Sequence, residues 1–345
     1  MRGLALGLVF AGLFFWTIAL RLMGRRLYPT WSIFQEAVVR QMRFSFGRLA
    51  GLHELGPTRR LMDALGAMGR IRRDKVRVAQ LGAGEPRGEW LTPTELEPGA
   101  GGGPVLLYLH GGGYVMCSPD THRMLVARVA RVTGARVLNL DYRLAPEFPF
   151  PAALDDTMAC YRWLLARGHK PGEILLAGDS AGGGLALATL KRLRDEGEPL
   201  PAGAMLLSPW VDLAAQDSSL EENAGLDYLG ALAPHMVELA GHYLNGVDAR
   251  DPLASPLHGD LSGLPPLLIH AGGAEVFRGQ VERLARRARE AGVQVEFTVY
   301  PGMIHVFHSF GGVFPQASEA LREVGDFARS VLAHGEQAQR IMNQP

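Results

Sequence analysis

From residue 105 onward, apolar segments with the length of β-strands alternate with segments of helical periodicity. The expected strands are VLLYLH (105–110), RVLNLDY (136–142), EILLAG (173–178), AMLLSP (204–209), LLIHA (267–271) and VEFTVY (295–300). Most of them lack a polar face, which is typical of a parallel sheet covered on both sides. Between them lie amphipathic stretches such as 279–293, with charged residues on one face and apolar residues on the other. The alternation predicts an α/β fold, a doubly wound and mostly parallel sheet with helices on both faces.

Two segments fall outside this alternation. Residues 27–75 look helical and aromatic, and residues 210–262 form an irregular insertion rich in Asp, Ser, Gly and Pro. A long insertion inside a compact domain is usually functional, for example as a lid. We therefore expect N-terminal cap helices over 27–75 and a main domain over 76–335 that carries a cap insertion near 210–262.

The first 26 residues differ in kind from the remainder. Residues 3–20 carry no charge and are followed by Arg21, Arg25 and Arg26. As a helix this run would be about 27 Å long, close to the roughly 30 Å of a bilayer core. The sequence TIALRLMGRR lacks the small residues of a signal-peptide cleavage site. We expect a single-pass membrane anchor over 1–26 with the body of the chain on the cytoplasmic side. The alternative is an apolar helix that covers a pocket.

Composition excludes several classes of protein. Lysine plus arginine equals aspartate plus glutamate at 35 each, so no net charge favours a nucleic-acid partner. The two cysteines, Cys117 and Cys160, form neither a CxxC motif nor a His/Cys cluster, so we expect no disulfide framework and no zinc site. The sequence contains no HExxH motif and no GxxxxGK[ST] motif. We expect no metal and no organic cofactor.

One serine lies between two glycines where an expected strand becomes a helix, in GDSAG (178–182). Small residues at such a junction let a helix pack closely on a sheet, which is the purely structural explanation. The same G-x-S-x-G pattern is that of a nucleophile elbow, in which a sharp turn raises the serine hydroxyl above the sheet. The chemical interpretation makes Ser180 a nucleophile and Asp179 a supporting residue of its motif.

A run of glycines follows another expected strand, in His110-Gly111-Gly112-Gly113. Successive glycines let the backbone approach a ligand and turn N–H groups toward it. An HGGG loop is a recurring half of an oxyanion hole, and the N–H after the serine is the other half. We expect the donors to be the N–H groups of Gly112, Gly113 and Ala181, with His110 and Gly111 supporting the loop.

The general base is expected late in the chain, after the acid. The segment YPGMIHVFHSF follows the last expected strand and offers His305 and His308. His305 comes sooner after the strand, where a loop can direct its ring over the sheet edge, so it is preferred to His308.

The acid is expected in the loop after the penultimate strand, where Glu275 is the carboxylate. A glutamate can accept the imidazole N–H and stabilise the imidazolium as an aspartate does. The alternative is that Glu275 is a solvated loop charge and that Asp251 or Asp260, in the insertion before that strand, serves instead.

Several motifs in this order resemble the hormone-sensitive-lipase family of α/β-hydrolases, also called the HGGG or family IV esterases. They are HGGGY, DYRLAPEFPFPAALDD, GDSAGG, LLSPWVDL and PGMIHVFH, and the resemblance covers about residues 75–330. It implies an eight-stranded, mostly parallel sheet with a helical cap. It also implies that Ser180 is the nucleophile, that His305 is the base and that Glu275 stands at the position of the acid.

The family often has acidic residues just after the position of Glu275, where this chain has Arg278-Gly279-Gln280. Anchored members such as arylacetamide deacetylase have a similar N-terminal apolar segment, which soluble members, including monoterpene lactone hydrolase-like esterases, lack.

The sequence therefore predicts a serine carboxylic-ester hydrolase that acts on small esters with short to medium acyl chains. A lactonase or an amide deacetylase with the same triad is the alternative, because the triad alone does not select the bond. A non-catalytic receptor for a small ligand on the same fold is a further alternative. The presence of candidates for serine, acid and histidine argues against it.

Overall fold

The computed structural model describes residues 2–50, 55–67, 75–96, 103–214 and 217–342. In this part of the chain an eight-stranded sheet has the strand order β1-β2-β4-β3-β5-β6-β7-β8. Its strands are β1 (Val76–Gln80), β2 (Gly88–Pro93), β3 (Val105–Leu109), β4 (Arg136–Leu140), β5 (Ile174–Asp179), β6 (Gly203–Leu207), β7 (Leu267–Gly272) and β8 (Val295–Tyr300). β1 and β2 pair antiparallel, and the six strands from β3 to β8 run parallel. The predicted α/β fold with a mostly parallel sheet is confirmed.

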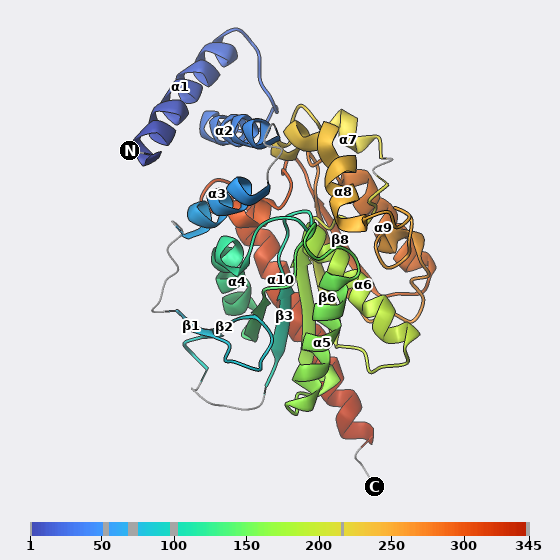
Figure 1. Cartoon of the computed structure of the whole chain (residues 1–345). Coiled ribbons are helices and arrows are strands. Elements are labelled where there is room, and N and C mark those ends of the chain that lie inside the picture. The colour runs from blue at the N-terminus through green and yellow to red at the C-terminus, as the bar shows by residue number, and fades with distance from the viewer. Residues whose placement is uncertain (1, 51–54, 68–74, 97–102, 215–216, 343–345) are drawn as a thin grey trace.

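Helices cover both faces of the sheet (Figure 1). α4 (Pro119–Thr133) and α10 (Gln316–Met342) share one hydrophobic cluster with the sheet. α5 (Ala152–Ala166), α6 (Ala181–Asp195) and α9 (Arg278–Glu290) share the other. In the parallel strands β3 to β7, residues of one strand belong to both clusters, because successive side chains of a strand point to opposite faces. These five strands are therefore buried on both sides, which is why they read as continuous apolar runs.

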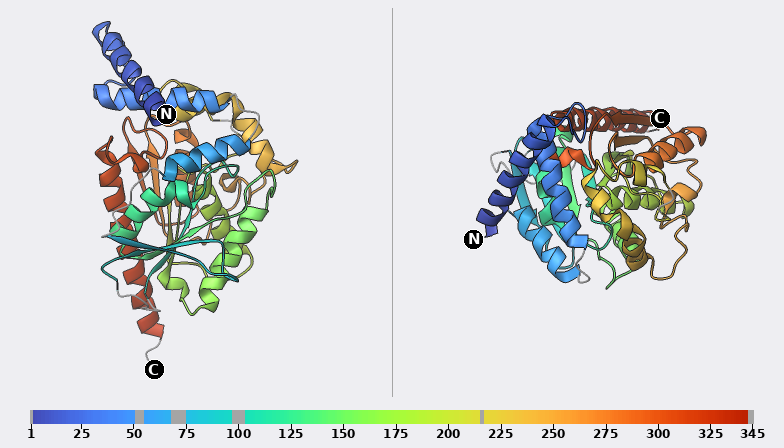
Figure 2. Two further views of the ribbon diagram at one scale, coloured as in Figure 1. Left: turned by 60° about the vertical axis from the view of Figure 1, so that its left-hand side comes forward. Right: turned by 90° about the horizontal axis from the view of Figure 1, so that it is seen from above.

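A cap lies over one end of the sheet, on the side away from the C-terminus (Figures 1 and 2). Its N-terminal part consists of α1 (Arg2–Leu22), α2 (Ile33–Ala50) and α3 (Leu55–Ala67). Its second part is the insertion between β6 and β7, with α7 (Ser219–Glu222), η2 (Tyr228–His235), α8 (Met236–Leu244) and η3 (Pro256–His258). A third hydrophobic cluster includes Trp31 and Val39 of the N-terminal part, Tyr228 of the insertion and Phe307 after β8. Both parts of the cap are thus packed onto the loops at the carboxyl end of the sheet.

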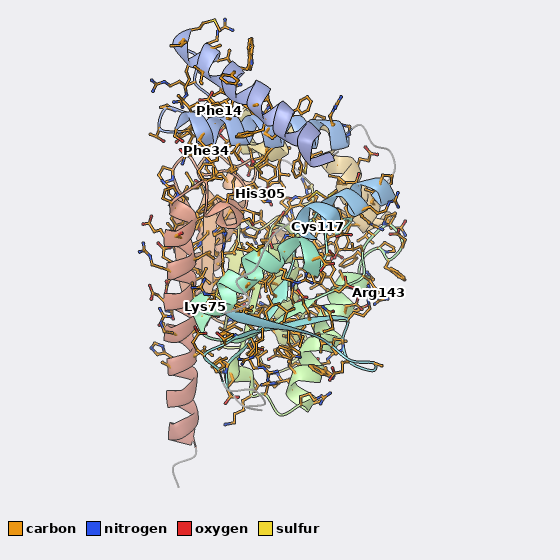
Figure 3. All side chains as sticks on the ribbon, turned by 90° about the vertical axis from the view of Figure 1, so that its left-hand side faces the viewer. Phe14, Phe34, Lys75, Cys117, Arg143 and His305 are labelled. Carbon is orange, nitrogen blue, oxygen red and sulfur yellow. The ribbon has the colours of Figure 1, made fainter. Side chains whose placement is uncertain are left out.

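The membrane anchor expected over residues 1–26 finds no support in the structure. Among the residues whose side chains are described, no helix is long and apolar enough to cross a membrane. α1 packs against α2, where the rings of Phe10 and Phe34 are 6.1 Å apart. Figure 3 shows the labelled Phe14 and Phe34 on these two helices, above His305.

Candidate active site

Ser180 occupies the sharp turn between β5 and α6. Its backbone lies in a strained region, with φ 53° and ψ −124°. The turn is held by two hydrogen bonds, from Ser180 N to Leu207 O at 3.0 Å and from Trp210 N to Ser180 O at 2.8 Å. A Cβ on Gly178 would lie 2.3 Å from Gly182 O, so this turn excludes a side chain at that glycine. Close packing therefore forms the sharp turn that a nucleophile elbow requires.

The glycine loop after β3 lies beside this turn. Gly112 and Gly113 have φ values of 119° and 63°, which favour glycine, and both line the same pocket as Ser180. Ala181 begins α6, so its N–H is one of the free donors at a helix N-terminus. Within the described part of the chain, the N–H groups of Gly112, Gly113 and Ala181 donate to no other group. These three donors are available to an oxygen atom in the pocket.

Asp179 ties the serine turn to the glycine loop. One carboxylate oxygen accepts hydrogen bonds from Tyr108 OH at 2.7 Å and from Gly111 N at 3.2 Å. The other oxygen lies 3.1 Å from Nε2 of His122. Burial opposes ionisation of Asp179, but the adjacent His122 and the hydrogen bonds lower its pKa below the ordinary value. Asp179 is therefore held as a carboxylate that fixes the loop.

The loop is held from its other side by Tyr142. The Tyr142 hydroxyl donates to His110 O at 2.6 Å, and its ring stacks on the His110 ring with centroids 4.3 Å apart. Burial lowers the pKa of His110 to about 3, so its imidazole is neutral at neutral pH. His110 and Gly111 thus shape the loop from behind, while Gly112 and Gly113 face the pocket.

The structure brings His305 and Glu275 together beneath the cap. The distance from His305 Nδ1 to Glu275 Oε2 is 3.9 Å, and both side chains are buried. Glu275 Oε2 accepts hydrogen bonds from Ser208 Oγ at 2.6 Å and from Gly272 N at 3.0 Å. Within the described residues, His305 Nδ1 and Glu275 Oε1 have no hydrogen-bond partner. A small movement would join the two groups, and such bonds are often long before substrate binds.

Aromatic rings fix the plane of the His305 imidazole. The Phe277 ring stands at 90° to it with centroids 5.1 Å apart, and the Tyr228 ring is tilted by 52° to it with centroids 6.3 Å apart. Burial among these groups lowers the pKa of His305 to about 3. The imidazole is therefore neutral at neutral pH, the state in which a histidine can accept a proton.

The other candidates for base and acid lie elsewhere. His308 is buried against His270, with 3.2 Å between their ring nitrogens, and it does not line the pocket. Asp251 accepts the N–H groups of Leu253 and Ala254 and so holds a turn of the insertion. Asp260 is exposed and accepts the N–H and hydroxyl of Ser262. Among the described residues, none of the three forms a hydrogen bond or ion pair with His305 or Ser180.

A cavity of about 360 Å³ opens above Ser180 and is apolar for most of its wall. It falls in the size range of small-molecule sites. Both parts of the cap contribute side chains to it, including Met42, Phe46, Met62, Leu229, Leu232, Met236 and Leu239. None of the described side chains of α1 lines it, so these residues give no support to the alternative that the first apolar segment covers a pocket. The N-terminal part of the cap lines the pocket through α2 and α3, and the insertion lines it through η2 and α8.

Sequence reasoning missed three polar residues of this site, His122, Ser208 and Asp227. His122 lies on α4, far in sequence from the serine motif, and only the packing of α4 on the sheet places it near Asp179. Ser208 directly follows β6 and has a positive φ of 50°, which is unusual for serine. Its place at the carboxyl end of a parallel strand is a signal that could have found it. Nothing in the sequence around Asp227 indicates its complete burial.

Comparison with known proteins identifies the family. A family model described as "alpha/beta hydrolase fold" matches residues 106–309. An acetyl-hydrolase of Streptomyces hygroscopicus is 44% identical over 276 residues, which cover 80% of this chain and 89% of that protein. The carboxylesterase/phospholipase LipF of Mycobacterium tuberculosis is 40% identical over 240 residues, covering 68% of this chain and 64% of that protein.

Solved structures agree with these relatives. The crystal structure of an esterase from the bacterial hormone-sensitive lipase family superposes with a TM-score of 0.81 and 40% identity, covering 88% of this chain and 100% of that one. A hormone-sensitive lipase from a metagenome library superposes with a TM-score of 0.78 and 36% identity, covering 86% and 99%. The chain therefore belongs to the hormone-sensitive-lipase family of α/β-hydrolases, and it is a carboxylesterase-like hydrolase.

Proposed function

We propose that the chain hydrolyses carboxylic esters with short to medium acyl chains through Ser180, His305 and Glu275. The observation that carries the proposal is the meeting of three segments in one cavity: the strained turn at Ser180, the loop at Gly112 and Gly113, and the loop that bears His305. Glu275 lies next to His305 but does not line the pocket. It would therefore act on the substrate only through His305.

In the first half of the reaction Ser180 Oγ attacks the acyl carbon while His305 takes the hydroxyl proton. The carbonyl oxygen becomes an oxyanion, which accepts hydrogen bonds from the N–H groups of Gly112, Gly113 and Ala181. Glu275 stabilises the imidazolium through Nδ1. The bond to the alcohol oxygen then breaks, His305 returns the proton to that oxygen, and an acyl group remains on Ser180.

Water completes the cycle by the same route. His305 takes a proton from the water as its oxygen attacks the acyl carbon. The second tetrahedral intermediate collapses, the bond to Ser180 Oγ breaks, and the proton returns to the serine. The products are the carboxylic acid and the free enzyme, and every proton is accounted for by His305.

The test is a series of p-nitrophenyl esters of graded acyl length, assayed beside an aryl amide and a lactone. We expect kcat/KM to rise from acetyl to medium chains and to fall for chains that exceed the 360 Å³ cavity. Ser180→Ala should remove nearly all hydrolysis of these esters while leaving the thermal unfolding temperature close to that of the wild type. A higher kcat/KM for the amide or lactone than for every ester would contradict the proposed substrate class.

A further inference from the structure

A short stretch of the cap insertion contacts the loop of the proposed acid through three buried polar side chains. We call residues 219–229 the clamp segment. Its polar side chains Ser219, Asn223 and Asp227 follow one another at intervals of four residues and are 1%, 5% and 0% exposed. Buried polar groups persist where each has a partner. The partners here are backbone groups of the two catalytic loops.

The first two contacts hold the acid loop. Ser219 Oγ donates to Val276 O at 2.7 Å, and Asn223 Nδ2 donates to Glu275 O at 2.8 Å. Both carbonyl groups belong to the turn after β7, directly at the acid. The clamp segment therefore fixes the backbone that carries Glu275 without touching its carboxylate.

Asp227 contacts both catalytic loops at once. Its Oδ2 accepts the N–H of Val276 at 2.9 Å, and its Oδ1 accepts the N–H of His305 at 3.4 Å. Oδ1 also accepts the N–H of Leu229 at 3.3 Å, as a cap of η2. Capping of η2 needs only the hydrogen bond from Leu229. The hydrogen bonds from Val276 and His305 are therefore additional, and they hold the two loops. One carboxylate from the cap thus joins the backbone next to the acid to the backbone of the base.

The base loop needs such support because its backbone is strained. Val306, directly after His305, has a φ of 46°, and a β-branched residue rarely adopts this conformation. Strain of this kind persists only where surrounding contacts hold it. Val306 N donates to Ser208 Oγ at 3.2 Å, and the Asp227 contact holds the residue before it.

Asp227 is in turn held from the N-terminal part of the cap. The Arg43 guanidinium, on α2, donates to the main-chain carbonyls of Ala224 and Asp227. Met42 and Phe46, the neighbours of Arg43 on α2, line the pocket. The same helix therefore contacts the substrate space and the clamp segment.

We propose that Asp227 is a positioning residue, held by Arg43, that keeps the Glu275 loop and the His305 loop at the relative position that catalysis requires. The proposal rests on the proposed function, because it acts through Glu275 and His305. Closing the 3.9 Å gap between their side chains requires that both loops stay in place. A misplacement of about 1 Å in such a site can cost about 10²-fold in rate.

The test compares Asp227→Asn with Asp251→Asn as the matched control. Both residues belong to the same insertion and accept backbone N–H groups, but only Asp227 accepts them from the catalytic loops, at Val276 and His305. Asp251 accepts those of Leu253 and Ala254, inside the insertion. An asparagine at 227 turns an NH₂ group toward one of the N–H donors. We expect kcat of Asp227→Asn to fall by about 10²-fold with KM little changed, and kcat of Asp251→Asn to stay at the wild-type value. A folded Asp227→Asn with wild-type kcat would overturn the proposal.

Arg43→Met is the second variant and keeps the test decisive if Asp227→Asn does not fold. This variant keeps the Asp227 carboxylate and removes the hydrogen bonds from Arg43 to the main-chain carbonyls of Ala224 and Asp227. We therefore expect kcat to fall, but by less than in Asp227→Asn. Wild-type kcat in a folded Arg43→Met would also count against the proposal.

A spectroscopic measurement separates positioning from general stability. A fluorophosphonate adduct on Ser180 mimics the tetrahedral intermediate, and we expect a strongly downfield proton NMR signal from His305 Nδ1–H bonded to Glu275. In Asp227→Asn the signal should move upfield or vanish although the protein is folded and labelled. Failure to label Ser180 in the wild type would refute the proposed function itself. Labelling with an unchanged signal in Asp227→Asn would refute only the positioning role.

Discussion

Glu275 and His305 lie next to each other, and both are buried. Burial raises the pKa of Glu275 to about 8 and lowers the pKa of His305 to about 3, so it favours the neutral form of each group. In the proposed mechanism the Glu275 carboxylate stabilises the His305 imidazolium, which forms only when His305 takes the serine proton. Glu275→Gln keeps the shape and removes that charge. We expect kcat to fall by about 10⁴-fold, as when the acid of other triads is replaced by its amide. Steady-state kinetics on a p-nitrophenyl ester measure this.

The control for this substitution is Glu323→Gln. Glu323 is also a carboxylate that contacts a histidine, since its Oε2 lies 3.1 Å from His270 Nε2, but it does not line the pocket. Its variant should keep the wild-type kcat. Near-wild-type activity in Glu275→Gln would remove Glu275 from the mechanism.

The pair of His122 and Asp179 makes a prediction about stability and pH. Burial disfavours the His122 cation, but the Asp179 carboxylate at 3.1 Å raises its pKa above the ordinary value. A raised pKa means that the pair stabilises the fold fully below pH ~6.5, the ordinary pKa of histidine, and that this stabilisation is lost as pH rises through the folded pKa. His122→Gln should therefore cost about 1.5–3 kcal/mol at pH 6 and less at pH 9.

Urea unfolding of the wild type and of His122→Gln at the two pH values measures this difference. An equal loss of unfolding free energy at pH 6 and pH 9 would show that the His122 charge does not contribute.

At the scale of elements, the crossing of α6 over β3 depends on glycine. A Cβ on Gly182 would lie 2.0 Å from Leu109 O, which no side chain can occupy without moving the helix. We expect Gly182→Ala to lower the free energy of unfolding by about 1–3 kcal/mol, the usual cost of overpacking. We also expect it to lower kcat, because a shift of α6 would move Ser180, which lies directly before this helix.

Gly241→Ala is the matched control for Gly182→Ala. Gly241 lies inside α8, and a Cβ there would meet nothing within 4 Å. Alanine should stabilise α8 by about 0.5–1 kcal/mol, since glycine is a poor helix former. Differential scanning calorimetry of both variants should give shifts of opposite sign. A neutral Gly182→Ala would contradict the close approach of α6 to the sheet.

The sequence predicts the parallel part of the sheet well because those strands are buried on both faces and read as apolar runs. The sequence does not predict β1 and β2 as strands, because VRVAQ and GEWLTP are partly polar and lack a continuous apolar run. The motifs at Ser180, Gly112 and His305 could be located because local backbone geometry demands glycine or a strand end there. Asp227 could not be located, because its role depends on how the cap folds back onto two distant loops.

At the scale of the whole molecule, α1 and the remainder of the cap make separable contributions. The described side chains of α1 line no part of the pocket, so deletion of residues 2–17 should leave kcat/KM unchanged.

Arg21 makes a separate contribution to stability, because its guanidinium pairs with the buried Glu36 at 2.8 Å. Deletion of residues 2–26 removes that partner and should cost about 1.5–3 kcal/mol of stability, the value of a hydrogen bond to a charged group.

Thermal unfolding and kcat/KM of the two truncated proteins test this division. Loss of activity in the shorter deletion would place α1 in the substrate site. Equal unfolding temperatures for the two deletions would show that the Arg21–Glu36 pair contributes nothing.

Peptide mapping after reaction with a fluorophosphonate tests whether Ser180 is the nucleophile that we propose for this hydrolase. We expect one labelled peptide, modified at Ser180, in the wild type and no labelling of Ser180→Ala. We also expect much slower labelling of His305→Ala, because the serine then lacks its base. Labelling at Ser208 or Ser309 with Ser180 unmodified would show that Ser180 is not the nucleophile.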